Sequence, residues 1–456
     1  MKTQIAIAGC PKLTPVLVKL LLMACFIGSA SRSPACGLCS PTVNLETLAK
    51  LAASENSAVA NQAIACLRGK GPAGLEALFA AHADAIHKRK SSVVLVPLAT
   101  NAVDSLWQRL SKALDAVGQQ RDCYTSRLFW FTDLERAKAA AQASGKPILS
   151  LRLLGRLDEE FSCANSRFFR TALYANEEVS RALREQFVLH WQSVRPAPRI
   201  TIDFGDGRKV ERTVTGNSIH YVLAPDGRPI DALPGLYGPK AFLRGLANAG
   251  NAARAYATHD AKAREAALLS CSLAVAGNTA HDAQAREKAL RDYHRQQLVT
   301  ISAEWSRDLV KASILASPAG GSAPLAKALQ LNDADWAKIA ALHADDARLD
   351  QASRSLMRAK NPDAFAAGRL AFSKRMVEDP LLRAIRHFER TIAEDTVRNE
   401  YTLHAKLHEW CAQGVTTDLN ALNEKVYAEL FLTPSSDPWL GLVPPDTYTA
   451  LERVSW

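Results

Sequence analysis

Long hydrophobic runs are almost absent from this 456-residue sequence. The one long uncharged apolar stretch lies within residues 1–30, which excludes a polytopic membrane protein. A basic stripe is missing too. The formal net charge is +10, but the excess is spread along the chain, and the only compact basic run is His87-Lys88-Arg89-Lys90. We therefore expect no nucleic-acid partner.

Motifs of three common enzyme classes are also missing. No GxSxG sequence supports a serine nucleophile. His404 and His408 do not form an HExxH zinc-protease motif, because Ala405 follows the first histidine. Asp203-Phe-Gly205 matches the metal triplet of protein kinases by letters only, since no glycine-rich loop or HRD sequence accompanies it. None of these enzyme classes is predicted.

The composition is that of a globular protein. Hydrophobic residues make up 48% of the chain and charged residues 22%, a balance that excludes an intrinsically disordered chain. The length predicts roughly two to four domains. It also suffices to bury a core, so neither disulfides nor a metal is needed merely for folding.

The amino-terminal segment resembles an export signal. Three lysines precede or enter the apolar run, and Gly28 and Ala30 are small residues at cleavage-site spacing. We expect residues 1–30 to be a cleaved signal peptide that directs the chain to the periplasm or outside the cell. A lipoprotein-type site at Leu22-Met23-Ala24-Cys25 and an uncleaved anchor are the alternatives, so the expected membrane contact is limited to such an anchor.

The nine cysteines become an odd number once the expected signal peptide is removed. At least one is then a free thiol or forms an intermolecular bond. Cys36-Gly-Leu-Cys39 is a candidate redox pair, or half of a metal site that no second CxxC completes. The simpler interpretation is a structural disulfide, either within the pair or from one of its members to Cys66.

Changes in pattern along the chain predict four parts. Residues 31–122, after the signal peptide, are expected to be helical. The apolar spacing that starts at Leu45 resembles a helical hairpin of the HEAT type. Residues 123–250 mix helices with strands. Residues 251–456 are mostly helical, with a linker near residues 317–324 that is rich in turn formers.

The middle part alternates helical and strand patterns. Thr132-Asp-Leu-Glu135 has the form of a capping box before an alanine-rich helix that ends at Ser144. Short strands, a helix starting near Cys163, two hairpins and a last helix follow. Their expected ranges are 148–154 and 187–191 for the strands, 200–215 and 219–233 for the hairpins, and 239–246 for the last helix. This order predicts an α/β domain with a mixed sheet.

Residues 127–249 resemble a thioredoxin-like domain. The matching features are Trp130 with the helix after it, Gly145-Lys-Pro-Ile148, Cys163 at a helix start, the Phe187-Val188 strand, and the closing hairpin at Ile219 to Gly227. The resemblance covers about a quarter of the chain. It implies a thioredoxin-like central domain flanked by mostly α-helical amino- and carboxy-terminal regions.

The resemblance places the reactive thiol at Cys163. In thioredoxins the attacking cysteine lies at a helix amino terminus, where backbone N–H groups favour the thiolate. The matching tetrad here is Cys163-Ala164-Asn165-Ser166, so Ser166 replaces the resolving cysteine. A CxxS site of this degenerate type can be captured as a mixed disulfide but cannot release itself by the usual route. The Cys36–Cys39 pair is a remote candidate for resolving such a disulfide.

The strand that faces this cysteine in thioredoxins starts after a cis-proline, which is replaced here by Asn217 and Ser218. The resemblance implies that these two residues, together with Trp191, face a substrate. His220 follows directly and is a candidate to contact Cys163, which would lower the pKa of the thiol. The other interpretation is that His220 points to the opposite face of its strand.

Together these features predict an exported protein that captures or senses thiols and disulfides through Cys163. Efficient disulfide reduction is not expected, and any enzymatic activity would be of the thiol–disulfide oxidoreductase type. The expected partner is a protein or a thiol-containing substrate, with no cofactor. The alternative is a non-enzymatic interaction module on a degenerate thioredoxin scaffold.

A third interpretation is a metal-binding protein. His404, His408 and Cys411 stand at i, i+4 and i+7, which places them on one face of a helix. Nitrogen and sulfur ligands suit a transition metal. The sequence identifies no remote fourth ligand, and a buried helix face with satisfied imidazoles is the competing interpretation.

Overall fold

The computed structural model describes residues 43–92, 105–213, 216–269, 275–316, 331–360, 380–414 and 418–437. The chain divides into two units, residues 1–44 and residues 45–456, and every helix and strand below belongs to the second. The predictions made for the signal peptide, for Cys36 and Cys39, and for the linker near residues 317–324 lie outside the described residues.

Short helices form the first part of the second unit. They are α2 (Leu45–Leu51), α3 (Ser57–Gly69), α4 (Pro72–Ala81), α5 (Ala83–Ser92), α6 (Ser105–Gly118) and α7 (Cys123–Ser126). Asn56 caps α3, because its side chain accepts from the backbone N–H groups of the next turn. Gly71, with a φ of 70°, makes the turn into Pro72 at the start of α4. Buried leucines such as Leu67 and Leu78 join these helices.

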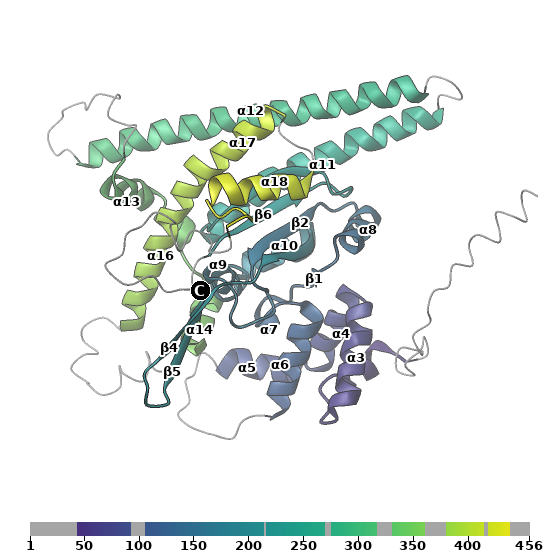
Figure 1. The fold of residues 1–456 in the computed structure, drawn as a ribbon. Coiled ribbons are helices and arrows are strands. Elements are labelled where there is room, and N and C mark those ends of the chain that lie inside the picture. Colours follow the sequence, from purple (N-terminus) through teal and green to yellow (C-terminus); the bar gives the residue numbers. More distant parts are fainter. Residues whose placement is uncertain are drawn as a thin grey trace, which may run out of the picture. The chain divides into compact units, whose positions relative to one another are not determined.

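A five-stranded mixed sheet forms the centre of the second unit (Figure 1). Its strands are β1 (Trp130–Phe131), β2 (Ile148–Leu154), β3 (Val188–Arg195), β6 (Ser218–Leu223) and β7 (Pro229–Pro234), in the order β1-β3-β2-β6-β7. The β1, β3 and β2 strands run parallel, whereas β2, β6 and β7 pair antiparallel. Every residue of the central strand β2 is buried. The α/β class with a mixed sheet is therefore confirmed.

The crossover helices are α8 (Leu134–Ser144), α9 (Ala164–Phe168) with the following π-turn η2 (Phe169–Leu173), and α10 (Glu177–Gln186). The predicted capping box is wrong by one position. Asp133, and not Thr132, is the N-cap of α8, since its carboxylate accepts from the Arg136 N–H at 2.9 Å. Gly145, with a φ of 67°, ends this helix as the sequence predicts.

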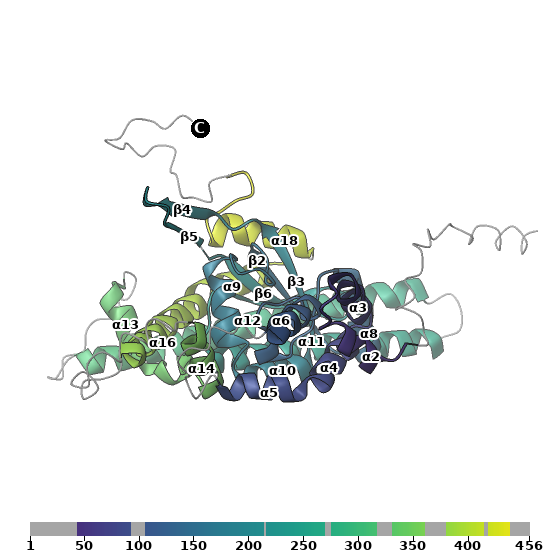
Figure 2. The same cartoon turned by 90° about the horizontal axis from the view of Figure 1, so that it is seen from below.

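The predicted hairpin before β6 forms a separate two-stranded sheet of β4 (Arg199–Asp203) and β5 (Lys209–Thr213). Its turn contains Gly205 and Gly207, whose φ angles of 76° and 89° favour glycine. The hairpin projects from the five-stranded sheet in two perpendicular views (Figures 1 and 2). All residues of β4 are exposed.

Helices dominate the remainder of the second unit. They are α11 (Pro239–Leu269), α12 (Val275–Ala316), α13 (Asp333–Leu342), η4 (Ala344–Ala347), α14 (Gln351–Lys360), α16 (Pro380–Arg398), η7 (Asn399–His404), α17 (Ala405–Ala412), α18 (Leu419–Lys425) and η8 (Val426–Leu430). The helix predicted for residues 239–246 is much longer, because the alanine-rich sequence after Gly250 contains no residue that breaks a helix. No helix among these described segments has the length and apolar character needed to cross a membrane.

Candidate functional site

Cys163 lies at the helix start that the sequence predicts. It follows β2 and a loop, and it is the N-cap of α9, where its Sγ accepts from the Ser166 N–H at 3.4 Å. The Ser166 hydroxyl donates to the Ser162 hydroxyl and, at 3.1 Å, to the Cys163 carbonyl. The predicted placement of Cys163 at a helix start is therefore confirmed.

The burial of Cys163 acts against an active thiolate. The residue is 0% exposed. Burial raises the pKa of the Cys163 thiol above its ordinary value, although the N–H and the hydroxyl of Ser166 act in the opposite direction. A nucleophilic cysteine needs a lowered pKa and access to its partner, so Cys163 is chemically quiet in this conformation.

Of the residues predicted to face a substrate, Asn217 is covered by residues 427–433. Ser218 contacts the tetrad, because its hydroxyl accepts from the Asn165 side chain at 2.9 Å. Asn217, in contrast, donates from its side chain to the Thr433 hydroxyl at 3.0 Å, and its carbonyl accepts from the Tyr427 hydroxyl at 3.2 Å. The face on which a substrate would lie is therefore held by η8 and the residues after it.

The other two predicted residues lie in closed environments. The ring Nε2 of His220 is 2.6 Å from the Tyr174 hydroxyl, and its ring packs against Phe169 and Phe242. Burial lowers the pKa of His220 to about 3, so the ring is neutral. No contact among the described residues joins His220 to the thiol. Trp191 donates from its indole N–H to the Gln119 carbonyl at 2.8 Å.

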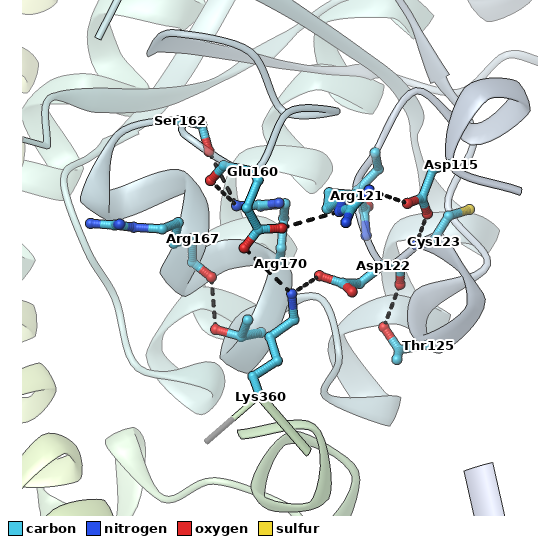
Figure 3. Close-up of polar contacts among 12 residues, drawn as sticks. Asp115, Arg121, Asp122, Cys123, Thr125, Glu160, Ser162, Arg167, Arg170 and Lys360 are labelled. Atoms are coloured by element: carbon cyan, nitrogen blue, oxygen red, sulfur yellow. Dashed lines mark hydrogen bonds and ion pairs between the residues drawn. The ribbon is translucent and has the colours of Figure 1, made fainter. Parts of the chain in front are cut away.

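A polar network, absent from the sequence predictions, fixes the loop that leads to Cys163 (Figure 3). The Arg170 guanidinium, 1% exposed, donates to the Glu160 carbonyl and to the Ser162 hydroxyl at 3.3 and 3.2 Å. The Glu160 carboxylate pairs with Arg121 at 3.1 Å. Lys360, at the end of α14, lies 2.6 Å from an Asp122 carboxylate oxygen before α7. Lys360 also lies 4.0 Å from a Glu160 carboxylate oxygen, so the loop is tied to residues from both flanking regions.

A second buried group collects histidines from the carboxy-terminal helices. His404 at the end of η7 and His408 in α17 meet Asp231 of β7, and the ligand atoms of all three lie within 4.8 Å of one another. The Asp231 Oδ1 atom is 3.0 Å from His404 Nε2 and 3.7 Å from His408 Nε2. All three residues are buried. We call these three residues the metal centre, because such a group could hold a metal ion.

Two residues of α12 form hydrogen bonds with residues of this centre. The two Nδ1 atoms of His294 and His408 are 2.7 Å apart, so a single proton lies between the two rings. The Tyr293 hydroxyl donates to the second carboxylate oxygen of Asp231 at 2.5 Å. The Nε2 atom of His408 has no hydrogen-bond partner although it is buried. It is the one polar atom of the centre that the described part of the chain leaves unsatisfied.

The electrostatics of the centre combine a stable carboxylate with a neutral ring. Burial alone would raise the pKa of Asp231, but His408 and His404 hold it well below its ordinary value. Burial lowers the pKa of His408 well below its ordinary value and that of His294 to about 4. Both of these rings are therefore neutral at physiological pH, and a neutral imidazole is the form that binds metals. His404 differs: burial acts to lower its pKa, but the Asp231 carboxylate raises it above its ordinary value, so an ion would have to displace a proton from this ring.

The structure changes the predicted ligand set. His404 and His408 come together as expected, but Asp231 and not Cys411 completes the group found among the described residues. Cys411 is half-buried, and burial raises the pKa of its thiol to about 12. The signal for Asp231 was available in the sequence Pro-Ile-Asp-Ala-Leu-Pro: an acid inside an otherwise apolar strand requires a buried partner.

The cysteines of the described residues differ in state. Cys123, Cys163 and Cys411 are free. Cys66 is disulfide-bonded, and its partner lies outside the described residues. Cys123 is fully buried beside Asp115, whose carboxylate accepts from the Cys123 N–H at 2.9 Å. Burial raises the pKa of Cys123 well above its ordinary value, so this thiol has a packing role.

Comparison with known proteins assigns no family to the chain. No family model, curated protein or solved structure matches it. The functional proposal therefore depends on the geometry of the metal centre and of the Cys163 site.

Proposed function

We propose that the protein binds a divalent transition metal of the zinc class at Asp231, His404 and His408. The observation that carries this proposal is the buried Nε2 atom of His408, which has no hydrogen-bond partner and faces a carboxylate oxygen 3.7 Å away. A buried polar atom without a partner costs about 1–3 kcal/mol. A bound cation between the nitrogen and the oxygen removes this cost.

The distances in the centre suit a metal. In a tetrahedral zinc site with bonds of about 2.1 Å, neighbouring ligand atoms stand about 3.4 Å apart. The two nitrogen-to-oxygen distances, 3.0 Å for His404 and 3.7 Å for His408, lie on either side of this value. Small side-chain movements therefore suffice to accommodate an ion. Imidazole nitrogens with one carboxylate are common ligands of zinc.

His294 prepares His408 for this role. If His408 donates its Nδ1 proton to His294, the lone pair of His408 Nε2 points to the negative oxygen of Asp231, an arrangement that a cation between the two atoms stabilises. If His294 donates instead, an Nε2–H group remains 3.7 Å from that oxygen, too far for a hydrogen bond. Metal-binding histidines usually donate their other N–H in the first way.

The burial of all three ligands favours a structural metal. Catalytic zinc sites keep one position open to substrate, whereas structural sites are closed. Here β7 supplies Asp231, and the helical segment η7–α17, far along the chain, supplies both histidines. A metal would therefore fasten the carboxy-terminal helices to the edge of the sheet. The chemistry it supplies is cross-linking through coordination.

The test is a metal titration of the full chain after chelator treatment. We expect one cobalt or zinc ion per chain, with visible absorption bands for cobalt that show nitrogen and oxygen ligands. The His408→Ala variant should lose this binding. His387→Ala, which removes an exposed histidine on α16, is the matched control and should retain it. Equal metal content in the two variants, or no binding to the native chain, would rule the centre out.

Thiol–disulfide capture at Cys163 is the second function we propose. Two observations favour it: Cys163 caps α9, and a parallel half of the sheet continues into an antiparallel hairpin, the order of elements on which the thioredoxin-like resemblance depends. Because the thiol is buried, capture requires the covering segment around Thr433 to move. The expected partner is a protein or a thiol-containing substrate.

Trapping experiments separate thiol capture from a purely structural domain. A mixed disulfide should form on the native chain and not on the Cys163→Ser variant. Little insulin reduction is expected, since Ser166 cannot resolve the bond. Identical trapping by both proteins would end the thiol proposal, and the interaction module on a degenerate scaffold would then be the better description.

Export remains part of this proposal. Disulfides persist mainly in oxidising compartments, and Cys66 carries one. Fractionation of cells that produce the full chain should place it in the periplasm or outside the cell, with the expected signal peptide removed. Recovery of the uncleaved chain from the cytosol would contradict the expectation.

A further inference from the structure

A pocket separate from both sites lies between the first helices and the sheet edge. Its volume is about 380 Å³, and it is bounded by α4, β1, α8, α10 and β3. This volume is typical of sites for small molecules. Its walls are mainly apolar: Leu75, Phe129, Phe131 and Phe187 line it, and all four are buried in the folded chain.

The polar part of the pocket is positively charged. Arg127, Lys146 and Arg184 line it together with a single acid, Glu76. The Glu76 carboxylate forms an ion pair with Arg127 at 2.5 Å. Among the described residues neither Lys146 nor Arg184 has an ion-pair partner. The Lys146 ammonium donates to the Arg184 carbonyl at 3.3 Å, and the Arg184 guanidinium donates to the Ser126 carbonyl at 2.5 Å.

A further cation, Lys90, lies near Arg127 and Arg184 but does not line the pocket. Burial lowers the pKa of Lys90, and the nearby cations Arg127 and Arg184 lower it further, while Glu177 acts in the opposite direction. Cations that repel one another in this way are stabilised when an anion binds between them. The pocket therefore combines an apolar body with a rim of three cations, of which only Arg127 forms an ion pair among the described residues.

We propose that this pocket binds a small anionic amphiphile, such as a single-chain alkyl carboxylate. The alkyl chain lies against the phenylalanine side chains, and the carboxylate lies between Lys146 and Arg184. Apolar burial supplies most of the affinity, whereas the two cations select the charge of the head group. This site is independent of the metal centre and of Cys163.

Calorimetric titration of the full chain with dodecanoate, below its micellar concentration, tests the proposal. We expect saturable binding of one dodecanoate per chain. Dodecanol and dodecylammonium, which share the alkyl chain, should bind at least about tenfold more weakly than dodecanoate. Dodecanol carries no charge to pair with Lys146 and Arg184, and dodecylammonium is repelled by these two cations. Equal binding of dodecanol and dodecanoate would overturn the proposed selection for anions, and the absence of saturable binding would overturn the site.

Two matched pairs of variants locate the binding. Ala140→Trp fills the pocket from α8 and should abolish binding, whereas Ala139→Trp, at an exposed neighbouring position outside the pocket, should not. Lys146→Met should weaken dodecanoate binding about tenfold and leave dodecanol unchanged. Lys138→Met is its control, because Lys138 pairs with Glu135 outside the pocket. Unchanged binding by Ala140→Trp or by Lys146→Met would place the ligand elsewhere and overturn the proposal.

Discussion

Cys163 and His408 are equally buried, each 0% exposed, but they differ in their hydrogen bonding. The sulfur of Cys163 accepts from the first turn of α9, and the hydroxyl groups of the neighbouring Ser162 and Ser166 form a hydrogen bond with each other. The Nε2 atom of His408 has no partner and faces the Asp231 carboxylate. Burial suppresses thiol chemistry at Cys163. At His408, burial leaves a nitrogen without a hydrogen-bond partner, and a ligand can bind to that atom.

The comparison shows that depth alone does not identify a functional residue. A buried group whose hydrogen bonds are complete contributes to stability and specificity of the fold. A buried group with one unmet bond lowers stability by about 1–3 kcal/mol unless something binds there. His408 is a buried group with one unmet hydrogen bond, and for this reason the metal centre is the stronger of the two candidate sites.

Replacing Asp231 should give the largest effect. Asp231→Ala leaves His404 and Tyr293 without their buried carboxylate partner, so we expect the free energy of unfolding to fall by about 3–5 kcal/mol. Urea denaturation of the metal-free chain measures this change. Asp84→Asn, at an exposed position of α5, should change it by less than about 0.5 kcal/mol. A loss below about 1 kcal/mol for Asp231→Ala would mean that the centre is not a structural junction.

Metal loading should have the next largest effect. At a free zinc concentration of about one hundred times Kd, the native chain should gain about 2.7 kcal/mol of unfolding free energy. The His408→Ala variant should gain nothing, because it lacks one ligand. Without metal the variant should already be less stable than the native chain, because it leaves a cavity and removes the hydrogen bond between His408 and His294, so each protein is compared with its own metal-free form. A zinc response that survives in His408→Ala would show that zinc binds at another place.

Local chemistry made part of both sites predictable. The capping position of Cys163, the glycine turns of the hairpins and the mainly apolar Ile148–Leu154 strand are signals within a few residues, and each corresponds to an observed element. The i, i+4 spacing of His404 and His408 is a local signal too. The length of α11 was missed because propensity, without a breaking residue, does not locate the end of a helix.

Long-range partners could not be predicted in the same way. Asp231 meets His404 only because β7 lies at the sheet edge against η7, a contact between segments far apart in the chain. The cover over Asn217 comes from Thr433, again from a distant segment. No single sequence specifies such contacts by spacing. An acid in an apolar strand predicts that a partner exists, but not which residue it is.

His343 extends the comparison, because both of its ring nitrogens lie within hydrogen-bond distance of carboxylates. His343 lies 2.6 Å from Asp308 of α12 and 3.2 Å from Asp346 of η4. Tyr401 donates to the same Asp308, and Arg244 pairs with Asp346 at 2.6 Å. The hydrogen bond to Asp346 raises the pKa of His343 most, burial opposes it, and the value reaches about 9. His343 is therefore charged where His408 is neutral.

This difference predicts a pH effect of intermediate size. The folded-state pKa of His343 lies above its ordinary value of 6.5, so its stabilisation is complete below pH 6.5 and is lost as pH rises through about 9. We expect a loss of about 1–2 kcal/mol across this window, since the half-exposed ring is screened by solvent. Urea denaturation on both sides of the window measures it. The His343→Gln variant should lack this part of the pH dependence, and an equal slope in both proteins would contradict the assignment.

The smallest expected effect tests whether the segment around Thr433 keeps the Cys163 thiol unreactive. The Arg195 guanidinium donates to the carbonyl groups of Thr433, Pro434 and Asp437, and so holds the segment whose Thr433 covers Asn217. Arg195→Ala should loosen this segment and increase the alkylation rate of Cys163 about fivefold, the effect of losing roughly 1 kcal/mol of hydrogen bonding. Mass spectrometry after iodoacetamide treatment follows the Cys163 peptide. Arg208→Ala, at the exposed hairpin turn, should leave the rate unchanged. Equal rates in all three proteins would mean that the packing of the sheet, and not the carboxy-terminal segment, keeps the thiol inaccessible.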